Sequence, residues 1–243
     1  VLEKKYYNFK GLNLSLETID GLVKHNGPIK DTTKIDKILG KNFFKNKINY
    51  TLNGSLEAQL SSIADDIAYN SHDLEDGLRA KLYNVEDLKD IPILSEIINK
   101  HKKFIKKKGI ELVIRQIIRD IINQMVKDVI AHTKKKIKEK KIKTIKDVYN
   151  QKNPIASFSD EMNLFDLSIK SFLKEKMYFN KMVLKKTNMG KKIIKFLFLK
   201  IKKKPLKFIK KSIFQKNNFE RNICDFIAGM TDRYAINLYN SLK

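Results

Sequence analysis

The amino-acid sequence predicts an all-α protein. Apolar residues recur three and four positions apart along most of the chain, which is the spacing of one face of an α-helix. Only 9 of the 243 residues are glycine and 4 are proline, so few positions interrupt a helix. No stretch shows the alternation of apolar and polar residues that is typical of a half-buried strand. With 42% hydrophobic residues, the composition is that of a folded chain of one or two domains.

Turn and cap residues divide the first half of the chain into four expected helices. We expect them over 14–23, within 31–50, over 55–77 and over 93–106. Gly27 and Pro28 should stop the first helix, and a loop should complete the segment 31–50. Ser55 suits the N-cap position of the third helix, because its hydroxyl can accept a hydrogen bond from a free backbone N–H. A short turn over 85–92 should precede the fourth helix.

The second half of the chain predicts longer helices. We expect them over 110–138, 160–180, 182–203, about 205–215 and 219–241. The first follows a break at Gly109 and has apolar residues four positions apart: Val113, Ile117, Ile121, Met125 and Val129. Asn180 separates the next two helices. Pro205 should end the second of them, because proline cannot continue a helix.

The net charge of +24 has two interpretations. It predicts affinity for polyanions such as nucleic acid, anionic membrane surfaces or nucleotide phosphates. However, lysine outnumbers arginine 46 to five, and Asn, Ile and Phe are also frequent. Because these residues have A/T-rich codons, we give more weight to coding bias, and the charge alone is weak support for a function.

Cysteine usage and hydropathy narrow the class of protein. The single cysteine, Cys224, excludes an internal disulfide and a multi-cysteine zinc site, and we expect it to be a small core residue. A reducing, cytoplasmic location fits, and no signal peptide is recognisable. The longest apolar run, IIKFLFLKI, is too short to span a bilayer and is interrupted by lysine, so we expect no transmembrane segment.

The segment 48–80 contains no lysine, although lysine is the commonest residue of the chain. Its sequence from Ser55 onward is SLEAQLSSIADDIAYNSHDLEDGLRA, with six acidic residues and one arginine. At about 100° per residue, one face of this helix is apolar. The apolar residues are Leu56, Leu60, Ile63, Ile67, Leu74 and Leu78.

The opposite face of the same helix is polar. It carries Asp65, Tyr69, His72 and Asp76, with Asp73 at its edge. One interpretation is an ordinary amphipathic helix with this face in water. The other is a cation site, because carboxylates gathered without neutralising lysines are what a hard cation requires. Small residues beside the acids would allow another molecule or another segment of the protein to approach this helix closely.

Three blocks occur between residues 11 and 243 in this order: GLNLSLETIDGLVKHNGP, SLEAQLSSIADDIAYNSHDLEDGLRA and DFIAGMTDRYA. They resemble the bacterial deoxyguanosinetriphosphate triphosphohydrolase-like proteins of the HD-domain superfamily, and the middle block is the most specific. The resemblance implies an all-α, HD-domain-like helical bundle. It assigns 1–110 to the remainder of the catalytic domain, with the fourth metal-ligand helix, and 111–243 to a C-terminal helical domain.

The resemblance also implies an activity and residue roles. Members of this family cleave a deoxynucleoside triphosphate to a deoxynucleoside and inorganic triphosphate, using a divalent metal, Mg²⁺ or Mn²⁺. The metal is held by a histidine, a His-Asp pair and a later aspartate, and that aspartate matches Asp65. A tyrosine that packs on the deoxyribose matches Tyr69, and an acid that can bond the sugar 3′-OH matches Asp73. Metal ligand, aromatic ring and hydroxyl acceptor would then lie on successive turns of one helix.

The adjacent His72 and Asp73 form an HD dipeptide, but they are not the expected metal pair. Neighbours on a helix point about 100° apart, and the surrounding residues match the fourth-ligand helix. In the family, the first histidine and the HD pair precede the GLNLSLET block, and this chain, which starts at Val1, contains neither. We therefore expect the C-terminal portion of such an enzyme, inactive by itself, with no general base that can be named.

Two further residues, His25 and Arg233, each have more than one interpretation. His25, before the Gly-Pro turn, can face the substrate pocket of Asp65 or can interact with the dipole of its own helix end. Arg233 can contact phosphate or a partner subunit, or can form a buried structural salt bridge. The expected partners are a dNTP substrate, single-stranded DNA as an effector, and further copies of the chain in a homo-oligomer.

The alternative to a dNTP hydrolase is a basic helical protein that binds nucleic acid or a membrane surface. It rests on the stretch KKTNMGKKIIKFLFLKIKKKPLKFIKK, in which lysines and apolar residues are about equally frequent. This alternative does not explain the acidic, lysine-free segment, so we rank it second.

Overall fold

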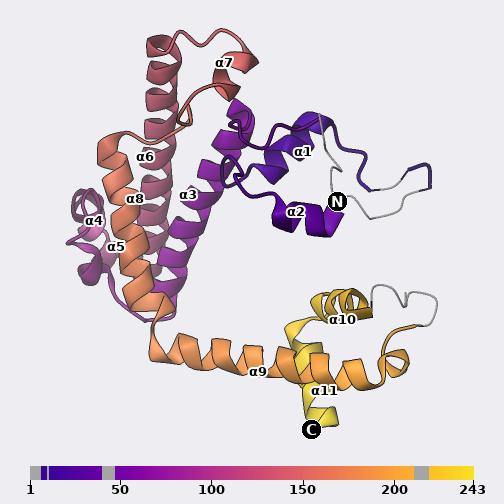
Figure 1. Ribbon diagram of the computed structural model, residues 1–243. Coiled ribbons are helices and arrows are strands. Elements are labelled where there is room, and N and C mark those ends of the chain that lie inside the picture. The colour runs from indigo at the N-terminus through magenta and orange to yellow at the C-terminus, as the bar shows by residue number, and fades with distance from the viewer. Residues whose placement is uncertain (1–6, 10, 40–46, 211–218) are drawn as a thin grey trace. The chain divides into compact units, whose positions relative to one another are not determined.

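The computed structural model describes residues 7–9, 11–39, 47–210 and 219–243. Over these residues every regular element is helical, which confirms the predicted all-α, HD-domain-like bundle (Figure 1). The α-helices are α1 Leu16–Val23, α2 Thr33–Leu39, α3 Leu56–Arg79, α4 Leu94–Lys102, α5 Ile105–Lys108, α6 Ile110–Glu139, α7 Ile145–Tyr149, α8 Asp160–Leu173, α9 Lys181–Lys203, α10 Phe219–Ala228 and α11 Asp232–Leu242. The short elements are the 3-10 turns η1 Val85–Leu88 and η3 Pro205–Lys207 and the π-helical turn η2 Lys174–Tyr178.

The chain divides into two compact units, Val1–Leu173 and Lys174–Lys243. The boundary between the units lies after Leu173, whereas the expected domain boundary lies between 110 and 111. The two differ because α6, which starts at Ile110, packs along α3 and α4 of the first unit. The expected limits therefore remain a prediction about functional domains and do not describe the compact units.

The first unit is built around α3, α6 and α8. Figure 1 shows these helices side by side, and α3 contacts both α6 and α8 while α4 packs on α6. All five α6 residues at the predicted four-residue spacing are buried, and so are the last three residues of the apolar face of α3. Each fully buried leucine or isoleucine contributes roughly 1.5–3 kcal/mol. This packing fixes which face of α3 remains outside.

The start of α3 is held by two polar side chains. The Ser55 hydroxyl accepts a hydrogen bond from the N–H of Ala58 at 3.2 Å, which confirms the predicted N-cap. Gln59 donates from Nε2 to the Gly54 carbonyl at 2.9 Å. Its Oε1 accepts from the N–H groups of Ile155 and Ala156, at 2.8 and 3.0 Å. The first turn of α3 is thereby joined to the segment that leads into α8.

Helix α1 lies against α3 and ends in a tight turn. Ser15 caps its start by accepting from the N–H of Thr18 at 3.3 Å. After Val23 the chain turns at 24–27, where the N–H of Gly27 donates to the Lys24 carbonyl at 2.8 Å. Gly27 has φ of 94°, a value that favours glycine, so the predicted stop at this residue has a backbone cause.

The second unit consists of α9 packed against α10 and α11. Its buried residues are Ile193, Leu197, Ile201, Ile209, Ile223 and Tyr239. The rings of Phe196 and Tyr239 meet edge to face at 4.9 Å, a favoured aromatic geometry.

Three expectations were wrong: two concern the extent of helices and one concerns the burial of a residue. The helix predicted over 93–106 is divided between α4 and α5. The helix predicted over 219–241 is interrupted between α10 and α11, where Thr231 caps α11 by accepting from the N–H of Tyr234. Cys224 is exposed rather than buried, because its neighbour Ile223 takes the core-facing position of α10. Part of the helix expected over 205–215 lies outside the described residues, and its described start is only the 3-10 turn η3.

Candidate functional site

The predicted polar face of α3 is solvent-accessible in the structure. Asp65, Tyr69, His72 and Asp76 are exposed, and Asp73 is half-buried. Tyr69 keeps 59% of its surface accessible, which is unusual for a tyrosine in a helix that also contributes to the core. This face therefore offers a carboxylate, an aromatic ring and a second carboxylate on successive turns.

The structure brings His25 to this face. Nε2 of His25 lies 3.6 Å from Oδ2 of Asp65, and their side chains are 41% and 72% exposed. His25 comes from the turn after α1, so the contact joins two elements that are distant in sequence. Of the two interpretations of His25, the geometry favours the one that places it beside Asp65.

An open cleft of about 390 Å³ runs between α1 and the first turns of α3, and His25 lines it. Its other lining residues are Glu17, Thr18, Gly21, Leu22, Ser55, Glu57, Ala58 and Ser61. The two helices approach closely here, because a Cβ atom at Gly21 would lie 3.2 Å from the Cβ of Ala58. The cleft opens one helical turn from Asp65, which follows Ser61 by four residues.

The acid next to Asp65 is already paired. Nζ of Lys170 on α8 lies 3.1 Å from Oδ2 of Asp66 and 2.8 Å from Oδ2 of the buried Asp166. Asn70 donates to the other oxygen of Asp166 at 2.8 Å. Burial alone would lower the pKa of Lys170, but its hydrogen bonds to the two aspartates raise it. This network orients α3 on α8, and it engages the carboxylate of Asp66 although that side chain is 56% exposed.

Tyr83 supports the turn of α3 that carries Asp73. Its hydroxyl donates to the carbonyls of Leu74 and Asp73, at 3.2 and 3.3 Å. Burial, together with the charges of Asp73 and Asp76, raises the pKa of Tyr83. The phenol stays protonated and therefore remains a hydrogen-bond donor.

Comparison with known proteins identifies relatives over nearly the whole chain. The model of the phosphohydrolase-associated domain matches residues 156–241. A deoxyguanosinetriphosphate triphosphohydrolase-like protein of Pelagibacter ubique is 53% identical over 237 residues, which is 98% of this chain and 64% of that protein. Proteins with the same description from Leptospira interrogans and Bartonella tribocorum are 37% and 35% identical, over 99% of this chain and 62% of their own lengths.

Over nearly its whole length the chain is homologous to deoxyguanosinetriphosphate triphosphohydrolase-like proteins. It spans less than two thirds of the length of these relatives. The domain model covers α8 to α11 and does not reach α3, so the family assignment of α3 rests on the match to the whole relatives.

The residues that the structure describes offer few metal donors near Asp65. Asp65 offers carboxylate oxygens and His25 an imidazole nitrogen, and among the residues that the structure describes no three histidine, cysteine or acidic side chains form a metal-binding group. Nδ1 of His72 lies 4.0 Å from Oε2 of Glu75, on the exposed side of α3. By themselves, the described residues do not fit a complete catalytic metal site.

Arg233 lies exposed in the first turn of α11. It belongs to the second unit, whereas Asp65 belongs to the first. Its contact with phosphate or a partner subunit therefore stays a prediction.

The packing of α9 weakens the nucleic-acid or membrane-surface alternative. The stretch that suggested it buries Ile193, Leu197 and Ile201 within the second unit, so much of its apolar face already contacts α10 and α11. The lysines of α9 are exposed, as a solvated face would be. No helix within the described ranges has both the length and the apolar character needed to cross a membrane.

The structure contains a buried polar contact that the sequence analysis did not identify. His101 is 9% exposed, and its Nε2 donates to Oδ2 of Asp120 on α6 at 2.8 Å. His101 follows Ile97 and Ile98 by four and three residues, so it shares the buried face of α4, a spacing that could have revealed its position. His132, on α6, is half-buried.

Proposed function

We propose that this chain supplies Asp65, Tyr69 and Asp73 to a metal-dependent site that hydrolyses a deoxynucleoside triphosphate of the dGTP type. The products are the deoxynucleoside and inorganic triphosphate. One observation carries the proposal: the three side chains lie on successive turns of α3, on the face opposite its buried residues, and His25 reaches the first of them. The names of the relatives support the same substrate class.

The roles follow from the side-chain chemistry. Four residues of an α-helix advance roughly 6 Å, so α3 can line one nucleotide from its phosphate end to its sugar. Tyr69 offers an exposed ring on which a deoxyribose packs. Asp73 accepts a hydrogen bond from the sugar 3′-OH, and the Tyr83 hydroxyl holds the backbone of that turn.

The proposed site includes a divalent metal, Mg²⁺ or Mn²⁺. When bound, such a cation supplies electrostatic stabilisation of the phosphate and lowers the pKa of a bound water. Asp65 would be one ligand, and His25 lies close enough to orient its carboxylate or to meet the substrate. Because the described donors do not complete a site, we propose that the other ligands come from outside the described residues and that the 243-residue chain alone does not turn over dNTPs.

The test joins this chain to the part of the Pelagibacter ubique relative that the match leaves out. Triphosphate release from dGTP with Mn²⁺ is then measured for the joined protein, for the chain alone and for the joined Asp65→Ala variant. Asp90→Ala, which changes an exposed carboxylate of the same unit, is the matched control. We expect activity only in the joined protein and in its Asp90→Ala variant.

Two results would overturn the proposal. One is turnover by the joined protein that Asp65→Ala leaves unchanged. The other is robust turnover by the chain alone, which would show that its own residues complete the site. Activation by single-stranded DNA and assembly into a homo-oligomer remain predictions that the same preparation can test.

A further inference from the structure

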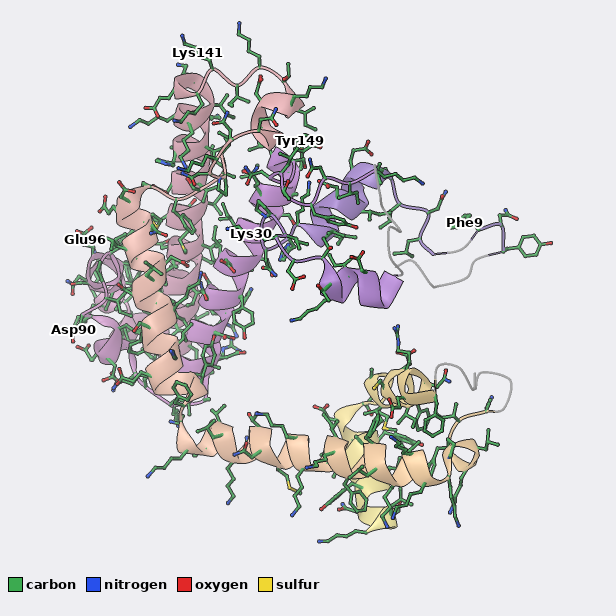
Figure 2. The ribbon with its side chains drawn as sticks, in the orientation of Figure 1. Phe9, Lys30, Asp90, Glu96, Lys141 and Tyr149 are labelled. Atoms are coloured by element: carbon green, nitrogen blue, oxygen red, sulfur yellow. The ribbon has the colours of Figure 1, made fainter. Side chains whose placement is uncertain are left out.

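Lys24 is a buried lysine in a strongly cationic chain. It is 5% exposed, whereas lysines such as Lys141, at the end of α6, lie in solvent (Figure 2). Moving a lysine ammonium out of water is costly unless partners compensate it. A buried lysine therefore calls for a reason, and Lys24 directly precedes His25.

The side chain of Lys24 is held by three different segments. Its Nζ lies 2.7 Å from Oδ1 of Asp20, one turn earlier on α1. It also donates to the carbonyl of Asn53, just before α3, at 3.4 Å. It lies 5.6 Å from the ring centre of Tyr149 on α7, a residue labelled in Figure 2. The ammonium thus joins α1 to the segment before α3 and to α7.

The backbone of Lys24 is fixed as well. Its N–H donates to the Asp20 carbonyl at 2.9 Å, which is the last helical bond of α1. Its own carbonyl accepts from the N–H of Gly27 at 2.8 Å and closes the 24–27 turn. His25 is the second residue of this turn, so the position of its Cα depends directly on Lys24.

We propose that Lys24 is a positioning residue that holds His25 against Asp65. Its ammonium anchors the start of the turn to Asp20 and Asn53, and the turn then directs the imidazole toward α3. The inference rests on the proposed function in treating His25 and Asp65 as site residues. A purely structural Lys24 would change the stability of the unit without changing the contact between His25 and Asp65 in the folded protein.

The experiment observes this contact by NMR, using the full chain without metal or nucleotide. The His25 imidazole resonances are assigned with the His25→Gln variant, since the chain has only 4 histidines. The change in these resonances on Asp65→Asn is then measured in the wild-type background and in Lys24→Met. We expect a clear shift in the wild type and less than about half of it in Lys24→Met, as for residues coupled through a third. Lys24→Arg, which keeps a cation that can pair with Asp20, should restore the response.

A matched control separates positioning from general loosening. Lys170→Met removes another ion-paired lysine of the same unit, one that pairs with Asp66. It should leave the response of His25 to Asp65→Asn unchanged. If Lys24→Met shows no cooperative unfolding transition, the same measurement is made with Lys24→Gln. The glutamine amide can still donate a hydrogen bond, but its side chain is too short to reach both Asp20 and Asn53.

The proposal is overturned if a folded Lys24 variant keeps the full His25 response, or if Lys170→Met reduces it equally. Neither outcome depends on catalysis. An inactive joined protein would count against the proposed function and leave this test intact.

Discussion

Nε2 of His25 and Oδ2 of Asp65 lie 3.6 Å apart, so the turn after α1 meets the middle of α3 at an exposed carboxylate. The contact places an imidazole beside the carboxylate that we propose as a metal ligand.

Asp65→Ala should leave the fold intact. The side chain is 72% exposed, so its removal creates no cavity, and the free energy of unfolding should change by less than about 0.5 kcal/mol. Leu74→Ala, on the buried side of the same helix, should cost about 2–5 kcal/mol. Thermal unfolding followed by circular dichroism measures both. Similar losses for the two variants would mean that Asp65 has a structural role.

Gly77→Ala should destabilise the first unit although alanine favours helices. A Cβ atom at Gly77 would collide with the hydroxyl and ring of Tyr83. Relieving such a collision costs about 1–3 kcal/mol, which exceeds the gain of about 1 kcal/mol in helix propensity. Urea unfolding should therefore show a lower midpoint for the variant.

The control for this prediction is Gly190→Ala. Gly190 also lies inside a helix, but a Cβ atom there would meet no other atom within 4 Å. This substitution should be neutral or should stabilise α9 by up to about 1 kcal/mol. Equal effects at the two glycines would refute the packing of Tyr83 on Gly77.

Acid should weaken the contact between α4 and α6 over a defined pH range. Burial raises the pKa of Asp120, but hydrogen bonds from His101, Lys100 and Gln116 outweigh this and lower the pKa from 3.8 to about 2. The unfolded state therefore binds the proton more tightly, and Asp120 stabilises the fold at pH values above about 4. This contribution, on the order of 1–2 kcal/mol, should be lost as the pH falls from about 4 to 2.

Asp120→Asn tests this range. The variant should be less stable than the wild type at pH 7, and the difference in free energy of unfolding should shrink below pH 4. Asp90→Asn is the control, because Asp90 is exposed at the outer side of the first unit (Figure 2). A difference for Asp120→Asn that stays constant between pH 7 and 2 would contradict the assigned pKa.

Asp73→Asn in the joined protein should weaken all four dNTPs similarly. A lost charged hydrogen bond to the sugar 3′-OH corresponds to on the order of 1–3 kcal/mol. A dideoxynucleotide, which lacks the 3′-OH, should bind the wild type more weakly than a dNTP by the same free energy. The Asp73→Asn substitution should weaken its binding little further. Inhibition constants measure these values. A change of preference among the bases would assign Asp73 to base recognition instead.

Local patterns predicted the helices and the exposed face of α3 well. The Ser55 cap, the apolar spacing of α6 and the polar face around Asp65 depend on residues that are near in sequence, and the structure has all three. Contacts between elements were harder to predict. The pairing of His101 with Asp120 depends on how α4 meets α6, and the sequence contains no local sign of that register.

The composition of single segments misled in two places. Cys224 stands among apolar residues, yet it is exposed because its neighbour Ile223 takes the core-facing position of α10. Lysine is so frequent that composition does not single out the buried Lys24 beside His25. The residues that hold the candidate site in place therefore emerged only with the structure.

The hydrogen bond between Gln59 and Ile155 also sets an order of events during synthesis. The two residues are separated by 96 positions, and Asn70 and Asp166 are separated by the same number. A ribosome that adds roughly 5–20 residues per second needs about 5–20 s between the synthesis of each residue of α3 and the synthesis of its partner. During this interval the nascent α3 lacks both anchors, so the Asp65 face becomes fixed only when α8 has been translated.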